Sequence, residues 1–419
     1  MGHQYPKLPA LCRPLLRAST VALPYSFYSL LGLIGLSLIL VYCRGQRWVD
    51  PLTRGTLAVA MGLLLLSCVT ASADLSGPVI DPRPEALLQL VNFLPFILLF
   101  VGLPALLRHV DVAHVLQRDI VWASLPISIA TVVEYGLKSP YWPVALQQWS
   151  WIEALRDAPH RGRPMVMFDH PNVLASYLVI VFGLAWGLLL SRKRLGGVAA
   201  VLGLTLVAIA CTGSRNGLAV ALLQTVIGLS ALWIPWYLKS GILVGVSGIG
   251  FGLTALSLGS ARWSAAALLA DPRVRLWKIA LDLIRDRPWL GWGLGSFKSL
   301  YPSRLIDPEY AQVFHPHNIG LLLAAEAGVG VTIALTLFVS FVVYRSIRAQ
   351  AALPNRHGPW FGSHLALLGI LGFACFDVTF YDGRVNALNW IVIASVYSST
   401  FWAKQFVKRS VKIRGSGLA

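Results

Sequence analysis

Charged residues are scarce in this chain, and acidic residues are the scarcest. Charged side chains make up 13% of the 419 residues, and only 18 residues are Asp or Glu. A typical soluble domain carries about 25% charged residues. Hydrophobic residues make up 56%, and the mean hydropathy is +0.66. Several apolar runs reach the ~20 residues that cross a hydrocarbon layer, so the composition predicts an all-α polytopic integral membrane protein.

Cysteine is also scarce, and its five positions show no paired spacing. They lie in or next to apolar runs: Cys12, Cys43, Cys68, Cys211 and Cys375. This pattern excludes a disulfide framework and a cysteine-based metal site. An internal repeat and a low-complexity linker are absent too. No cleavable signal peptide is expected, because the apolar stretch at 30–40 is followed by further spans.

Apolar runs bounded by Arg, Lys, Gly and Pro predict eleven membrane spans. They are 24–43, 55–72, 86–108, 119–138, 173–191, 196–212, 217–238, 241–259, 318–344, 360–381 and 386–403. A twelfth, less apolar helix is expected within 8–25, because eleven spans would leave the basic N-terminus outside. The prediction is therefore about 12 transmembrane helices. They divide into N-terminal helices at 1–259, a large helical periplasmic loop at 260–317, C-terminal helices at 318–403 and a basic cytoplasmic tail at 404–419.

The net charge of +17 is mostly a signal of this topology. Basic residues gather at 192–195, at 345–359 and after Lys404, as they do in cytoplasmic segments. Such an inner face attracts anionic membrane lipid, and no nucleic acid partner is implied. The same orientation puts 260–317 outside, where its eight basic residues predict a polyanionic ligand, since Arg matches phosphate oxygens two at a time.

Within this loop, Asp271 and Pro272 predict the N-cap and first residue of an amphipathic helix at about 272–286. One face is mainly apolar and the other has charges of mixed sign. The two sets are Arg273, Trp277, Leu281 and Ile284 on the first face, and Arg275, Lys278, Asp282 and Arg285 on the second. Arg273 is therefore the basic residue expected to point inward and bind the ligand. The alternative is an Arg that snorkels from a packed helix end.

Three further positions are candidates for chemistry. Arg215 lies between two spans in a glycine-flanked hairpin whose amides could surround an anion, or it anchors a helix end. His317 begins the helix that starts near Asn318, where the helix dipole favours a neutral imidazole able to accept a proton. The alternative for His317 is a capping role. His315 and His317 form a pair without a third ligand at recognisable spacing, so no metal is predicted.

Carboxylates near the last predicted hairpin are the remaining candidates. Asp377 and Asp382 bracket its external end together with Arg384, and a carboxylate at the bilayer boundary is a functional hypothesis. A structural ion pair with an Arg is the alternative. The segment 169–172 could cap the following helix or line the same external cavity, and capping is favoured.

The ordered motifs resemble the O-antigen ligase and polymerase superfamily. They are Pro171-Asn172-x-x-Ala175, the hairpin 212–217, Arg273-x-x-x-Trp277, Pro288-x-x-Gly291-x-Gly293-x-Gly295 and His317-Asn318 followed by Gly328. The resemblance covers about 165–390. It implies a glycosyltransferase of the Gram-negative inner membrane that is metal-independent, needs no cofactor and has a periplasmic active site.

In the ligase branch, the resemblance implies transfer of a glycan from undecaprenyl pyrophosphate to a sugar hydroxyl of the lipid A core, giving lipopolysaccharide. His317 corresponds to the catalytic residue, whereas Arg215 and Arg273 bind substrate. Asn318 belongs to the same motif, and the acidic position corresponds to Asp377 or Asp382.

Three alternatives remain open. An O-antigen polymerase would add the same donor to another lipid-linked glycan. A protein O-oligosaccharyltransferase would use a Ser or Thr acceptor, and usually has extra soluble C-terminal sequence. A flippase or transporter is less favoured, because its charges would lie in mid-membrane along many helices rather than on one face.

Overall fold

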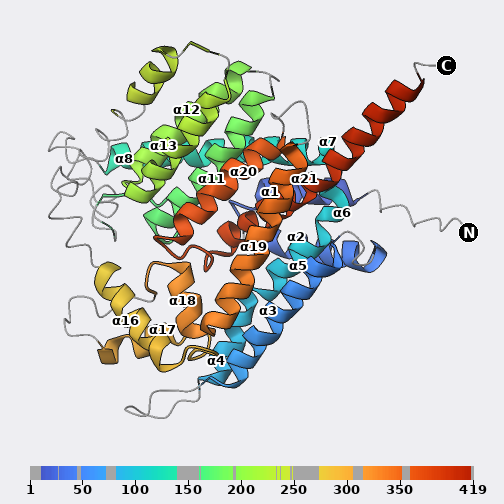
Figure 1. Cartoon of the computed structure of the whole chain (residues 1–419). Helices are drawn as coiled ribbons and strands as arrows, with labels where there is room; N and C mark the ends of the chain where they lie inside the picture. The colour runs from blue at the N-terminus through green and yellow to red at the C-terminus, as the bar shows by residue number, and fades with distance from the viewer. Residues whose placement is uncertain are drawn as a thin grey trace, which may run out of the picture.

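The computed structural model consists of helices throughout the part of the chain that it describes (Figure 1). The described residues are 11–26, 28–44, 49–71, 82–138, 160, 162–191, 195–232, 234–235, 237–245, 248, 273–304, 315–351 and 359–416. Within these ranges every regular element is an α-helix or a 3-10 helix.

The N-terminal half contains both short and long helices. They are α1 (Cys12–Ala22), α2 (Tyr28–Arg44), α3 (Pro51–Val69), α4 (Arg83–Leu88), η2 (Gln89–Asn92), α5 (Leu94–Gly102), α6 (Pro104–Leu107), α7 (Val110–Ala123) and α8 (Leu125–Leu137). Helices α5, α6 and α8 each carry a proline in their first two positions. Proline has no N–H to continue the preceding helix, which explains why these segments are divided.

The C-terminal half contains the longest helices and the segments of the large loop. They are α11 (Pro171–Leu190), α12 (Leu195–Cys211), α13 (Arg215–Ser230), α16 (Arg273–Asp286), α17 (Phe297–Leu300), η4 (Pro302–Arg304), α18 (Ile319–Glu326), α19 (Gly328–Ala351), α20 (Pro359–Ala374) and α21 (Gly383–Ser416).

Five helical segments are long and apolar enough to cross a membrane. They are Pro51–Val69, Arg83–Leu107, Val110–Leu137, Pro171–Leu190 and Gly328–Ala351. Shorter apolar helices lie at Tyr28–Val41, Gly196–Cys211 and Trp360–Ala374. The chain is therefore a helical membrane protein with several candidate spans. Most of the span expected at 241–259 lies outside the described residues.

Three expected boundaries differ from the structure. The extra helix expected within 8–25 is α1, whose 11 residues are too few to cross a membrane by themselves. The expected span at 318–344 is divided between α18 and α19, because Gly328 adopts a left-handed backbone with φ +88. The expected tail at 404–419 continues α21 as far as Ser416.

Helix α11 is the centre of the larger hydrophobic core, with nearly all of its residues buried. It packs closely on α20 at two glycines. A Cβ at Gly183 would collide with the backbone of Ala366, and one at Gly187 would collide with Gly362. Small residues allow two helix backbones to approach closely, as membrane helices commonly do.

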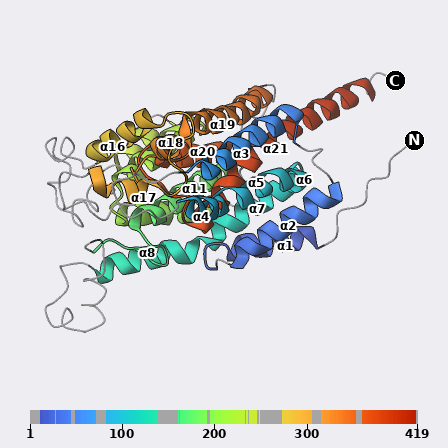
Figure 2. The ribbon, with the colours of Figure 1, turned by 90° about the horizontal axis from the view of Figure 1, so that it is seen from below.

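A second, smaller core holds the loop helices against the ends of the membrane helices. Leu276 and Leu283 of α16 pack there with Phe297 of α17, with Leu322 of α18 and with Val378. In Figures 1 and 2, α16 and α17 lie at one end of the molecule, and the C-terminal end of α21 lies at the other. The described part of the loop that the sequence singles out, at 273–304, is thus packed at one end of the protein.

Candidate active site

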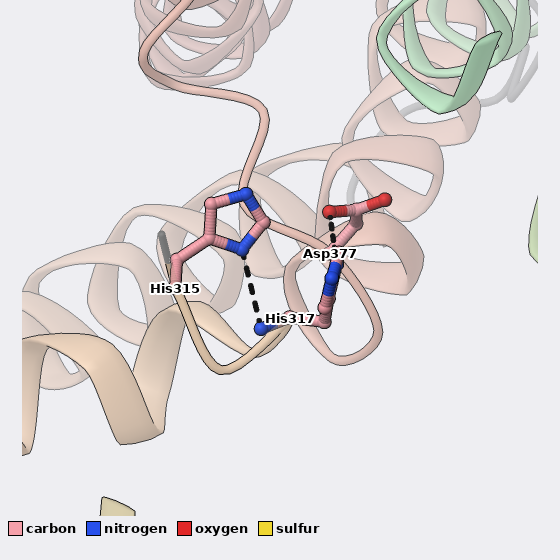
Figure 3. A group of neighbouring side chains, drawn as sticks. All are labelled: His315, His317 and Asp377. Carbon is pink, nitrogen blue, oxygen red and sulfur yellow. Dashed lines mark hydrogen bonds and ion pairs between the residues drawn. The ribbon is translucent and has the colours of Figure 1, made fainter. Parts of the chain in front are cut away.

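The candidate site is a pair formed by a histidine and an aspartate at the end where α16 lies. His317 immediately precedes the N-cap of α18, and Asp377 follows α20. Nδ1 of His317 lies 2.9 Å from Oδ1 of Asp377 (Figure 3). Asp377 is 5% exposed, whereas the side chain of His317 is 25% exposed. One partner is thus enclosed, and the other can be reached from outside.

Both oxygens of Asp377 accept hydrogen bonds. Oδ1 accepts from the backbone N–H of Val378 at 2.8 Å, and Oδ2 accepts from Nδ2 of Asn172 at 2.6 Å. Burial by itself raises the pKa of Asp377. The hydrogen bonds from His317 and Asn172, together with the positive charge His317 and His315 can carry, outweigh burial and hold this pKa below its ordinary value. Asp377 is therefore an ionised carboxylate that accepts and does not donate.

This carboxylate fixes the tautomer of His317. Since an ionised carboxylate only accepts, Nδ1 of His317 carries the proton and donates it to Asp377. In the neutral imidazole, Nε2 then has the free lone pair. The sequence pattern predicted that a helix dipole favours the neutral imidazole. His317 in fact lies outside α18, before its N-cap Asn318, and Asp377 decides which nitrogen can accept a proton.

His317 has an unusual, left-handed backbone conformation. Its φ is +51, in the left-handed region that residues with a Cβ rarely adopt, and such strain gathers at functional sites. The backbone N–H of His317 donates to Nδ1 of His315 at 3.3 Å. Burial, and secondarily the charge of His317, lower the pKa of His315 to about 4, so His315 remains a neutral acceptor at pH 7.

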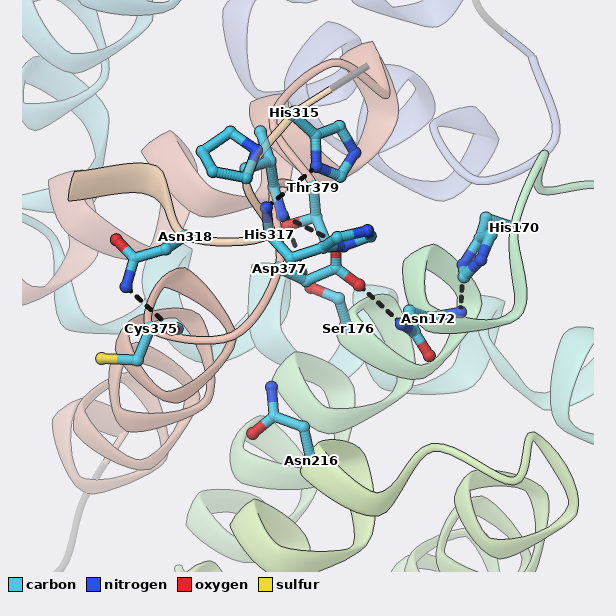
Figure 4. Close-up of polar contacts among 12 residues, drawn as sticks. His170, Asn172, Ser176, Asn216, His315, His317, Asn318, Cys375, Asp377 and Thr379 are labelled. Carbon is cyan, nitrogen blue, oxygen red and sulfur yellow. Dashed lines mark hydrogen bonds and ion pairs between the residues drawn. The ribbon is translucent and has the colours of Figure 1, made fainter. Parts of the chain in front are cut away.

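Asn318 holds this turn in place through both ends of its side chain (Figure 4). Its Oδ1 accepts from the N–H of Leu321 at 2.9 Å and so caps α18. Its Nδ2 donates to the carbonyl of Cys375 at 2.9 Å, next to the end of α20. Asn318, a predicted substrate-binding residue, is thus a helix cap that joins α18 to the end of α20.

Asp382 has a different partner from Asp377. Its carboxylate pairs with Arg384 at 2.6 Å and accepts the backbone N–H groups of Arg384 and Val385 at the start of α21. Arg384 in turn donates to the carbonyl of Met167 at 2.9 Å. The two carboxylates that the sequence could not separate thus belong to two sets of contacts, and Asp377 is the one beside His317.

Helix α16 contacts the histidine turn through Trp277. Nε1 of Trp277 donates to the carbonyl of Pro316 at 3.0 Å, and its ring lies 6.4 Å from that of Phe376. Arg273 lies one helical turn before Trp277 on the same side and is partly buried, whereas Arg275 is exposed.

The buried stripe of α16 differs from the expected one. It consists of Leu276, Ala280 and Leu283, while Leu281, expected on the apolar face, is 44% exposed. The true stripe is rotated from the expected face, and Arg273 lies at its edge.

Arg215 begins α13, directly after the N-cap Ser214, whose Oγ accepts the N–H of Gly217 at 3.2 Å. The next residue, Asn216, donates through Nδ2 to the carbonyl of Gly372 near the end of α20. The hairpin therefore contacts the helix that leads to Asp377, and Figure 4 shows Asn216 on the side of the cluster where α13 begins.

Two residues of this cluster were missed in the sequence. Capping was the expected role of 169–172, and His170 does cap α11, since its Nδ1 accepts the N–H of Asn172 at 3.0 Å. Asn172 also binds Asp377, which lies 205 positions away. Arg163 contacts Asn172 in turn and belongs to no motif. Only the Pro171-Asn172 motif pointed to this part of the site.

The cluster also contains a group of side chains that could hold a metal ion. One ligand atom from each of His315, His317 and Asp377 lies within 4.8 Å of the others. Sequence spacing gave no third ligand for the histidine pair, and the fold brings Asp377 to it from 60 positions away. The 2.9 Å distance between Nδ1 and Oδ1 is that of a hydrogen bond.

Comparison with known families agrees with this geometry. Residues 176–339 match the family model described as O-antigen ligase. This region is therefore similar to O-antigen ligases. Members of that family are glycosyltransferase-like enzymes of lipopolysaccharide biosynthesis. No curated protein matches the chain significantly. The matched region includes Arg215, Arg273 and His317, whereas Asp377 lies beyond it.

Proposed function

We propose that the protein is an O-antigen ligase. It transfers a glycan from undecaprenyl pyrophosphate to a sugar hydroxyl of the lipid A core, without a metal ion and with inversion at the anomeric carbon. The observation that carries the proposal is the hydrogen bond from Nδ1 of His317 to Oδ1 of Asp377 in a chain with a region similar to O-antigen ligases. This bond leaves Nε2 of a partly exposed imidazole as the proton acceptor.

The chemical step needs one base. As the acceptor hydroxyl oxygen forms its bond to the anomeric carbon, Nε2 of His317 takes the hydroxyl proton. The bond between that carbon and the pyrophosphate oxygen breaks on the opposite face, and the electron pair leaves with the pyrophosphate. A positioned base contributes typically ~10²–10⁴-fold to such a step. Asp377 stabilises the imidazolium that forms, as the carboxylate of a catalytic triad does.

The leaving pyrophosphate needs positive charge. Arg215 at the start of α13 and Arg273 at the start of α16 are the donors we assign to it, because guanidinium groups bind phosphate oxygens in pairs. The N-terminus of α13 adds backbone N–H groups on the same side. Asn318 and Asp382, which cap α18 and α21, support the site rather than bind substrate.

The active site faces the periplasm in this proposal. Helices α16 and α17 lie at the opposite end of the molecule from the last turns of α21, where Lys408, Arg409 and Lys412 occur in the sequence. Basic residues accumulate on the cytoplasmic side of membrane proteins, which supports an external position for α16. About twelve spans in the inner membrane of a Gram-negative cell, with the donor's lipid tail remaining in the bilayer, complete the proposal.

Reconstitution tests the assignment. Purified protein in liposomes is given a lipid-linked glycan together with either lipid A core or a second lipid-linked glycan, and the products are separated on a gel. A ligase extends the lipid A core alone. Growth of the second lipid-linked glycan instead identifies a polymerase, and no transfer to either acceptor overturns the proposal.

A further inference from the structure

Arg163 is a buried arginine close to the candidate site, and its guanidinium connects two separate segments. The residue is only 9% exposed. Its Nε donates to the carbonyl of Thr212 at 2.7 Å, and a terminal nitrogen donates to Oδ1 of Asn172 at 2.8 Å. Thr212 begins the hairpin before Arg215, and Asn172 lies in the first turn of α11. One planar side chain therefore fixes the distance between these two segments.

The hydrogen bond from Arg163 to Asn172 determines how the amide of Asn172 is oriented. Arg163 has only donors, so the atom that faces it must be the carbonyl oxygen of Asn172. The amide nitrogen then faces Oδ2 of Asp377, to which it donates at 2.6 Å. Both neighbours require the same orientation, so the Asn172 amide has one consistent assignment. Figure 4 shows this amide between α11 and Asp377.

The amide in turn holds the carboxylate. With Oδ2 taken by Asn172, Oδ1 is the oxygen that receives Nδ1–H of His317 and the N–H of Val378. A chain of three hydrogen bonds thus runs from Arg163 through Asn172 and Asp377 to His317. A rotation of the amide would place its oxygen against Oδ2 of Asp377 and would remove one hydrogen-bond donor from the carboxylate.

The hydrogen bond from Arg163 to the carbonyl of Thr212 holds the hairpin. The carbonyl of Thr212 follows directly on α12, at the negative end of that helix, where unpaired carbonyls attract a cation. Two residues later Ser214 caps α13, and Arg215 starts it. The position of Thr212 therefore sets the position of the arginine assigned to the pyrophosphate.

The segment around Arg163 is itself held firmly. Nζ of Lys138, which is buried, donates to the carbonyl of Arg163 at 3.1 Å and pairs with Glu134 at 2.6 Å. The carboxylate of Glu134 accepts the backbone N–H groups of Met165 and Val166. Because the C-terminal end of α8 and Lys138 hold the backbone at Arg163 and just after it, the guanidinium is presented in a fixed place.

We propose that Arg163 is a positioning residue that couples the base to the pyrophosphate-binding hairpin. It orients Asp377 through Asn172, and it places Arg215 through Thr212. The inference rests on the proposed function, because it takes His317 as the base and Arg215 as the phosphate ligand. Arg163 contacts neither reacting group itself.

Two readouts separate this role from a purely structural one. The first readout is the acid limb of the plot of transfer rate against pH. On this limb the rate falls because His317 becomes protonated and can no longer act as the base. His315 and His317 interact with the charge of Asp377, and His170 nearby interacts with Asp377, His317, Arg163 and His160. Arg163→Gln removes one positive charge and loosens the Asn172 amide, so Asp377 attracts the imidazolium more strongly. The acid limb should move to higher pH.

The second readout is donor affinity, measured without turnover. In a His317→Ala background, binding of radiolabelled lipid-linked glycan reports on the pyrophosphate-binding arginines without turnover. Arg163→Gln should weaken this binding and should lower kcat about 100-fold, since a displacement of ~1 Å costs as much. Asn172→Leu removes the contact of Arg163 with Asn172 and keeps its hydrogen bond to Thr212. This variant should therefore shift the acid limb and leave donor binding as in the wild type.

Arg384→Gln is the matched control. Arg384 also holds this segment, through the carbonyl of Met167, but it pairs with Asp382 and not with Asp377. It should lower thermal stability without moving the acid limb or donor binding. If Arg163→Gln behaves like Arg384→Gln while His317→Ala is inactive, the coupling is overturned and the proposed function stands. If His317→Ala is active, the proposed function itself fails.

Should Arg163→Gln fail to fold, Asn172→Leu decides. A shifted acid limb with unchanged donor binding supports the relay through Asp377, and a wild-type acid limb overturns it. Arg163→Lys is the conservative variant. This variant keeps the positive charge, but its single ammonium group cannot reach two acceptors as the planar guanidinium does. Compared with Arg163→Gln, it should therefore bring the acid limb closer to its wild-type position than it brings kcat to its wild-type value.

Discussion

Nδ1 of His317 donates to Oδ1 of Asp377 across 2.9 Å, although the two residues lie 60 positions apart in the chain. One belongs to the turn before α18 and the other to the turn after α20. The bond requires both turns to be held together, which Asn318 achieves by bonding the carbonyl of Cys375. The imidazole is thereby oriented before any substrate binds, so the site is preorganised for proton transfer.

Removing the imidazole should abolish transfer. His317→Ala should lower kcat by about 10²–10⁴-fold, because the acceptor hydroxyl loses the group that takes its proton. Initial rates of glycan transfer in liposomes measure the effect, with the amount of inserted protein as the control. Near-normal attachment of glycan to the lipid A core by this variant would remove the base role from His317.

Asp377→Asn should be nearly as damaging as the loss of His317. The amide keeps the shape of the carboxylate but can donate toward Nδ1, which favours the wrong tautomer, so a kcat loss of about 10²–10⁴-fold is expected. Asp382→Asn is the matched control, since Asp382 bonds Arg384 and the start of α21. It should lower the melting temperature and leave kcat within a few-fold. Equal kcat losses for the two variants would contradict the assignment.

The kcat lost on replacing an arginine should depend on the position of that arginine and not only on its charge. Arg215→Ala and Arg273→Ala should each cost about 10²–10³-fold in kcat, the usual effect of removing one donor to a developing anion. Arg275→Ala, two residues away on the exposed side of α16, should be mild. Measured kcat values for the three variants test this order. A severe Arg275→Ala with a mild Arg273→Ala would show that the other face of α16 meets the substrate.

The fold could be anticipated where a local pattern determines it. The apolar runs place α11, α12 and α21, and the Asp271-Pro272 pair places α16 to within one residue. The division between α18 and α19 could not be anticipated. It depends on Gly328, where a Cβ would collide with the carbonyl of Trp289 from the loop, and an apolar run gives no sign of that contact.

The site shows the same limit. His317, Arg215 and Arg273 stand in recognisable motifs, so the sequence pointed to them. Asp377 and Asp382 lie five positions apart at one turn, and only the packing of α18 on the end of α20 assigns one of them to His317. Arg163 lies in no motif because its role depends on two distant oxygens.

Acid should destabilise the protein through the histidine turn. Burial lowers the pKa of His315 from 6.5 to about 4, so between these values the unfolded chain binds a proton that the folded protein does not. Asp377, whose pKa is held below its ordinary value, adds stability that is lost at still lower pH. The melting temperature should therefore fall as pH drops from 6.5 toward 4. His315→Asn should reduce this dependence, and an unchanged dependence would show that His315 is not the titrating group.

Metal removal decides between two uses of the same three side chains. If a proton joins His317 to Asp377, treatment with EDTA should leave the transfer rate unchanged, because His317, Arg215 and Arg273 supply the base and the positive charge. Added Zn²⁺ should inhibit, since a metal bound by His315, His317 and Asp377 would occupy the imidazole and displace the shared proton. Rates are measured before EDTA, after it, and after Zn²⁺ or Mg²⁺ is restored. A rate that EDTA abolishes and a divalent ion restores would replace the metal-independent mechanism with a metal-assisted one, in which the same three residues are ligands.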